Sequence, residues 1–142
     1  MVIRPELPVS LQSAPQTITE LRKEAGQRIE SLAGQTRLRY ITDSAGQGET
    51  YAAKFADAKA YIAAGYPTDA TPYVWINAEA TATGTTPTQV ADLIVYTANL
   101  WALVGAQIEG ARQAAKIGLN SALTTETIET LETAFKAAMA AL

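Results

Sequence analysis

This chain of 142 residues contains no cysteine and no histidine. The lack of cysteine excludes disulfide bonds, thiol nucleophiles and thiolate-bound zinc or iron–sulfur clusters. The lack of histidine removes the most common general base and the most common ligand of transition metals. We therefore expect no metal site and no cofactor, and any catalysis would have to rely on carboxylates, tyrosine, lysine and serine.

A strong charge of either sign is also lacking. There are 11 basic and 14 acidic residues, a net charge of −3, which disfavours nucleic acid as the main partner. The longest apolar runs, near residues 93–96 and 100–106, are shorter than the ~20 residues that a membrane span needs. The first ten residues, MVIRPELPVS, place prolines and charges where a secretory signal is apolar. We expect a soluble protein that binds neither nucleic acid nor a membrane.

The glycine-containing segment ITDSAGQGE, residues 41–49, resembles a ligand-binding loop only superficially. No Gly-Lys-Ser/Thr follows and no strand precedes, so it is not a phosphate loop. Asp43 lacks the ligand spacing of a calcium loop, and Lys54 stands where such a loop has glutamate. No pair of carboxylates is spaced as a glycosidase would require, and the Glu-x-x-His motif of helical di-metal sites is impossible. We predict that the protein is not an enzyme and that this loop joins two helices.

Apolar spacing, capping motifs and stop residues predict an all-α fold, a bundle of four to five helices. The first helix begins at Thr17, where Thr17 and Glu20 form a capping box. The predicted ranges are Thr17 to about Tyr40, Glu49 to Ala64, Pro72 to Thr83, Thr86 to Asn120, and from Thr124 or Thr125 onward. For the second helix we predict a buried stripe of Tyr51, Phe55, Ala58 and Ile62, and for the third we expect Trp75 and Ile76 to cover the core.

The fourth helix carries apolar residues at alternating steps of four and three, which is typical of helices that pack lengthwise. We call this set the inner ladder: Val90, Ile94, Thr97, Trp101, Val104, Ile108, Ala111 and Ala115. A second apolar face follows the same helix: Leu93, Tyr96, Leu100, Leu103, Gly110, Ala114 and Ile117. A long helix that is apolar on two sides is central to a bundle, or packs on its own domain with one face and on a partner with the other.

Residues 1–16 form a separate region before the bundle of residues 17–142. Pro5, Pro8 and Pro15 prevent a helix, and Leu7, Val9 and Leu11 alternate with smaller or polar residues. This pattern predicts an extended arm with one apolar face, which either docks on a partner or is a frayed terminus.

Residues 28–40, RIESLAGQTRLRY, and the following ITDSAGQGETYAAKFADAKAYIAAGYP resemble a segment of bacteriophage tail proteins. The later stretches WINAEATATGTTPTQVADLI and LWALVGAQIEGARQAAK are similar to it too, so the resemblance covers about residues 20–140. The family is that of small helical proteins associated with phage tail fibres. It implies a structural role in the virion tail after assembly in the host cytoplasm, no cofactor, and contacts with other tail or fibre proteins. The chain carries no receptor-binding sequence of the kind that often sits beside this segment.

Two roles remain open: a structural component of the tail, baseplate or fibre attachment region, and a fibre-assembly chaperone that does not stay in the virion. We expect a homo-oligomer. Trp101 is either an internal core residue or a central interface anchor. The candidate partner interface comprises Leu7, Val9, Leu11, Ile94, Trp101, Val104 and Ile108.

Overall fold

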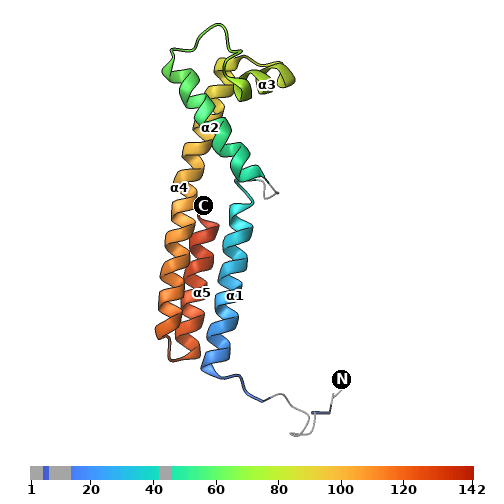
Figure 1. Cartoon of the computed structure of the whole chain (residues 1–142). Helices are drawn as coiled ribbons and strands as arrows, with labels where there is room; N and C mark the ends of the chain where they lie inside the picture. Colours follow the sequence, from blue (N-terminus) through green and yellow to red (C-terminus); the bar gives the residue numbers. More distant parts are fainter. Residues whose placement is uncertain (1–4, 7–13, 42–45) are drawn as a thin grey trace.

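A computed structural model describes residues 5–6, 14–41 and 46–142. These residues form an all-α fold built around one long helix, as the sequence predicts. Figure 1 shows the elements in chain order, and their bounds are α1 (Ile18–Arg37), α2 (Gln47–Ala63), α3 (Val74–Thr83), α4 (Pro87–Ser121) and α5 (Thr125–Ala140).

Both predicted capping boxes are present. The Thr17 hydroxyl accepts the backbone N–H of Glu20, whose carboxylate accepts the N–H of Thr17, and Thr86 and Gln89 repeat this arrangement at the start of α4. The threonines thus satisfy N–H groups that a helix leaves unpaired at its first turn. Gly84 takes a left-handed conformation, φ 69°, at the end of α3, where a residue with a side chain would be strained.

Helix α1 ends at Arg37, three residues before the predicted end at Tyr40. Residues 38–40 form a turn that directs two side chains toward the end of α5. Arg39 donates to the carbonyl oxygen of Met139 at 2.9 Å, and the Tyr40 hydroxyl donates to that of Leu142. The last carbonyl groups of a helix lack internal partners, so these donors stabilise the carboxyl end of α5.

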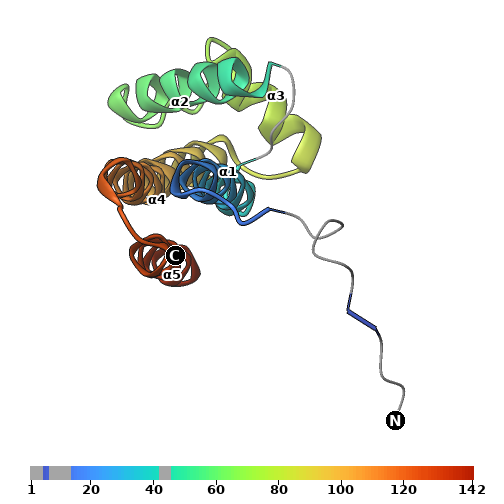
Figure 2. The same ribbon diagram turned by 90° about the horizontal axis from the view of Figure 1, so that it is seen from below.

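Helix α4 is the only described helix that packs against all four others. At 1.5 Å per residue its 35 residues span on the order of 50 Å. Its carboxyl half packs with α1 and α5, and its amino half packs with α2 and α3 (Figure 1). Figure 2, along the bundle axis, shows α2 and α5 on opposite sides of α4.

Two separate hydrophobic cores result. We call the first the three-helix bundle: α1, α5 and residues 104–121 of α4. Its buried residues are Ala25, Ile29, Ala33, Val104, Ile108, Ala115, Leu119, Ala122, Ile128, Phe135 and Met139. We call the second the head: α2, α3, the loop between them and residues 87–95 of α4. Its buried residues are Ala58, Tyr61, Ala70, Ile76, Ala80, Val90 and Ala91.

The predicted stripe of α2 is partly wrong. Ala58 is buried and Phe55 and Ile62 are half-buried, but Tyr51 is exposed, and the buried aromatic residue of α2 is Tyr61. Tyr61 is held by two edge-to-face contacts, with ring centroids 5.8 Å from Tyr66 and 5.2 Å from Tyr73. Both partners lie in or beside the loop between α2 and α3, so spacing within α2 could not identify them.

On α3, Ile76 is fully buried as expected. Trp75, which was also expected to cover the core, is 43% exposed. This correction has a geometric reason: adjacent residues on a helix point about 100° apart, so a ten-residue helix on a small core buries only one of them.

Candidate interaction surfaces

The predicted interface residues of α4 belong to the inner ladder, and the structure places most of this ladder inside the molecule. Ile108 is fully buried and Val104 nearly so, both in the core of the three-helix bundle. Ile94 is half-buried against the head, and Trp101 is half-buried against the bundle.

Val104 and Ile108 are therefore corrected from partner contacts to core residues, because side chains that fill the chain's own core are not accessible to another molecule. For Trp101, the interpretation as an internal residue is the one that the packing favours. Leu7, Val9 and Leu11 lie outside the described residues.

The second apolar face of α4 is the one that remains exposed. Leu93, Tyr96, Leu103 and Ile117 are 61%, 66%, 62% and 66% exposed. We call the full set the outer stripe: Leu93, Tyr96, Leu100, Leu103, Gln107, Gly110, Ala114 and Ile117. Single exposed apolar residues are common on soluble proteins, but a contiguous row of large ones marks an interaction site.

A groove with a volume of about 500 Å³ lies between α2 and the middle of α4. Its walls are mostly apolar, with Phe55 from α2 and Ile94 and Trp101 from α4. The single ion pair at its rim joins Lys54 Nζ to Glu79 at 2.5 Å, which neutralises both charges. Such a groove suits an apolar side chain or an extended peptide better than a charged ligand.

No pattern in the sequence predicts this groove. Its residues come from the turn after α1, from α2, from α3 and from α4, over residues 40–101. The groove exists because α2 crosses α4 in the region between the two cores, where neither core fills the space.

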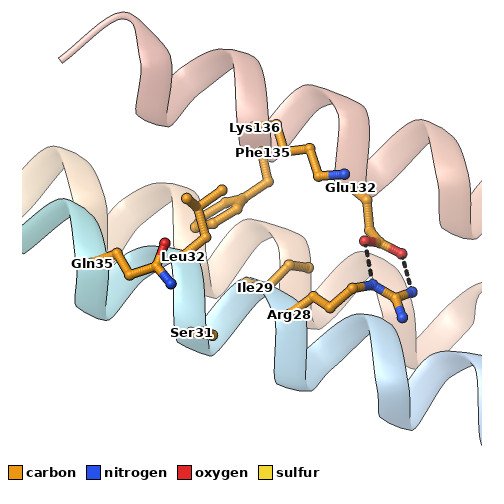
Figure 3. Close-up of a pocket in the computed structure, with 8 residues that line it drawn as sticks. All are labelled: Arg28, Ile29, Ser31, Leu32, Gln35, Glu132, Phe135 and Lys136. Carbon is orange, nitrogen blue, oxygen red and sulfur yellow. Dashed lines mark hydrogen bonds and ion pairs between the residues drawn. The ribbon is translucent and has the colours of Figure 1, made fainter.

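A smaller cavity, of about 200 Å³, lies between α1 and α5 (Figure 3). Arg28 donates two hydrogen bonds to the carboxylate of Glu132 there, with Nε 2.8 Å from Oε2 and Nη2 2.5 Å from Oε1. The hydrogen bond from Arg28, opposed by burial, lowers the pKa of the Glu132 carboxyl. Since each charge already has its partner, this pair holds α1 to α5 and offers no free acid or base.

A second charged cluster joins α1 to α4. Arg112 donates to Glu109 on its own helix at 2.8 Å and to Glu30 on α1 at 2.7 Å, and Lys116 lies 3.0 Å from Glu30. The hydrogen bond from Arg112 lowers the pKa of Glu109 to about 2, and that from Lys116 is the main cause of the lowered pKa of Glu30. Opposite charges here stay ionised, as in a structural network rather than a catalytic one.

Asp57 has a capping function that sequence reasoning missed. Its carboxylate on α2 accepts the backbone N–H of Ile76, in the first turn of α3, at 3.0 Å. The helix-initiating residue Tyr73 has no side chain that could serve, so α2 supplies the cap in its place. A signal for this cap was not available, because the two residues meet only in the folded chain.

Within the ranges that the structure describes, no group of three or more acidic side chains is arranged to hold a metal ion. By length and composition alone, α4 could cross a membrane, a criterion that the core helix of a soluble protein also meets. The expectation that the protein avoids membranes therefore stays a prediction.

No protein-family model, curated protein or solved structure matches this chain.

Proposed function

We propose that this protein is a structural component of a bacteriophage tail, baseplate or tail-fibre attachment region, and that it works by packing helices against neighbouring proteins. The exposed outer stripe of α4 is the observation that supports packing against neighbouring proteins. The placement in a phage tail rests on the resemblance of residues 20–140 to tail-fibre-associated proteins.

The energetics favour a surface that is covered in the assembled state. Burying one large apolar side chain contributes about 1.5–3 kcal/mol relative to leaving it in water. Leu93, Tyr96, Leu103 and Ile117 each keep more than half of their surface exposed along one helix face. The ion pairs of Glu30 with Arg112 and Lys116 hold the carboxyl half of this helix to α1.

Mass spectrometry of purified particles tests this proposal. Peptides from this chain in stoichiometric amounts would support a virion component. A chain that is needed for infectious particles but missing from them would contradict it.

The groove between α2 and α4 favours the alternative, a tail-fibre assembly chaperone that leaves before the virion is complete. An apolar groove open to solvent could hold an extended client segment and release it. Ala52→Asp at the groove wall would then block fibre folding, whereas Ala56→Asp, an exposed residue of the same helix outside the groove lining, would not. Equal effects of the two variants would contradict the chaperone role.

A further inference from the structure

We propose that the outer stripe is the contact surface of an antiparallel dimer of this chain. The inference deepens the proposed function, since it names the first partner that covers this face. Its residues follow one another at alternating steps of three and four from residue 93 to residue 117. This spacing lets two straight helices pack knobs into holes along their length.

The distribution of side-chain size along the stripe favours a second copy in the opposite direction. The amino half carries Leu93, Tyr96, Leu100 and Leu103, whereas Gly110 and Ala114 stand in the carboxyl half. An antiparallel pair centred near Gly105 places Leu100 opposite Gly110 and Tyr96 opposite Ala114 of the second copy. Leu100 and Tyr96 then fill the space above two small residues, which favours dense packing there, while Leu93 faces Ile117 and Leu103 faces Gln107.

A parallel pair would lack this match. Gly110 would face Gly110 and Ala114 would face Ala114, so voids would line one half of the contact. Voids weaken a contact, so the parallel arrangement is disfavoured.

The residues beside the stripe raise no electrostatic barrier. The exposed flank consists of Asp92, Asn99, Ala106, Gln113 and Asn120, with a single charge. In the antiparallel register Asn99 lies beside Gln113 of the second copy, where the two amides can hydrogen-bond. Asp92 then lies at the level of Gly118 of the second copy, with Asn120 close by, so no charge of the same sign opposes this carboxylate.

The extent of the stripe is sufficient for a specific dimer. From Leu93 to Ile117 it is about 36 Å long at 1.5 Å per residue. Two copies packed along this length would remove on the order of 1,200 Å² from water, at the lower end of the range for specific dimers.

Sedimentation of the full chain tests the dimer, with Leu103→Asp as the disrupting variant and Val74→Asp as its control. Both residues are more than half exposed, so neither change should unfold the monomer, and far-UV circular dichroism checks this. We expect a dimer whose dissociation constant rises at least 100-fold in Leu103→Asp and stays unchanged in Val74→Asp. A monomer at all concentrations, or a dimer that is insensitive to Leu103→Asp, would overturn the proposal.

Cross-linking tests the orientation, and the natural chain supplies a background free of cysteine. A mixture of Tyr96→Cys and Ala114→Cys chains should form a mixed disulfide under mild oxidation, while Tyr96→Cys alone should not form a homodimeric one. A disulfide between two Tyr96→Cys chains would indicate parallel helices and overturn the antiparallel assignment.

Binding to phosphatidylcholine vesicles through the outer stripe, with no dimer in their absence, would also overturn the proposal and would make a lipid surface the occupant. The dimer and the proposed function can fail separately. A dimer of a chain that is absent from virions would contradict only the structural role, and a virion protein that is monomeric in solution would contradict only the dimer.

Discussion

The three-helix bundle and the head are built on the same helix, yet they are stabilised by different means. The bundle buries large side chains, among them Ile29, Ile108 and Phe135, and clamps its helices with ion pairs. Four of the seven buried residues of the head are alanine, and the only buried aromatic is Tyr61.

This difference shows how one long helix can support two cores of unequal strength. Alanine buries little surface, so the head depends more on single polar contacts, such as the bond from Ile76 to Asp57 and the pair of Lys54 with Glu79. Between the cores, α4 is exposed along its outer stripe and lines the groove with the adjacent face, and Leu93 belongs to both surfaces. We therefore expect the bundle to be the stable scaffold and the head to be the more easily opened part.

The largest effect is expected when one large buried side chain is removed from either core. Ile108→Ala and Ile76→Ala remove fully buried side chains from the bundle and the head, and each should lower the free energy of unfolding of its own core by about 2–5 kcal/mol. Urea unfolding followed by fluorescence measures the two transitions. A chain that keeps only Trp101 reports on the bundle, and a chain that keeps only Trp75 reports on the head. If both variants lowered both transitions equally, the two cores would be a single cooperative unit.

Acid should weaken the bundle more than the head. Three bundle carboxylates, Glu30, Glu109 and Glu132, have lowered pKa values, so their stabilising effect is complete above their ordinary pKa near 4.5 and is lost as the pH falls through the folded values. For Glu109 that loss extends down to about pH 2.

Urea midpoints at pH 7, 4 and 3, read with the same two fluorescence reporters, measure the effect. Glu109→Gln should flatten the pH dependence of the bundle and leave that of the head unchanged. A head that loses stability first on acidification would contradict the comparison.

A smaller effect is expected where α5 is clamped to α1. Glu132→Gln removes the charge of a nearly buried carboxylate, but the side chain of Arg28 is half exposed and can be solvated, so the loss should be about 1 kcal/mol. Glu129→Gln, on an exposed position of the same helix, is the matched control and should change the stability of the bundle by less than about 0.5 kcal/mol. Thermal unfolding of the two variants at pH 7 measures the difference, and equal values would mean that the clamp has no net effect.

The smallest effect should be an increase in the stability of the three-helix bundle. Gly34 lies inside α1, and a Cβ built there meets no atom within 4 Å, so Gly34→Ala should stabilise the bundle by about 0.5–1 kcal/mol. Gly118→Ala provides the contrast, because its Cβ would come within 2.7 Å of Leu131. In thermal unfolding, Gly34→Ala should show the gain expected from helix propensity, and Gly118→Ala should fall below it.

Local signals predicted the helices well. Thr17, Thr86 and Gly84 act through neighbours within a few residues, so their roles as caps can be recognised in the sequence. The inner ladder also predicted correctly that α4 packs along most of its length. The errors concern contacts that reach beyond a single helix: the partners of Tyr61 in and beside the loop after α2, the cap that Asp57 supplies to α3, and the groove that α2 forms with α4.

The sequence by itself determined that the chain is helical, where the threonine-capped helices α1, α4 and α5 begin, and that α4 is apolar on two faces, because spacing and capping depend on residues only a turn or two apart. The predicted starts of α2 and α3, Glu49 and Pro72, differ by two residues from the observed Gln47 and Val74. Only the tertiary structure decided which face is free. Most of the inner ladder packs against α1, α2, α3 and α5, and Val104 and Ile108 are buried there and cannot contact a partner. The outer stripe has the same spacing, but no described helix covers Leu93, Tyr96 or Leu103, and burial is a property of the folded arrangement rather than of the pattern.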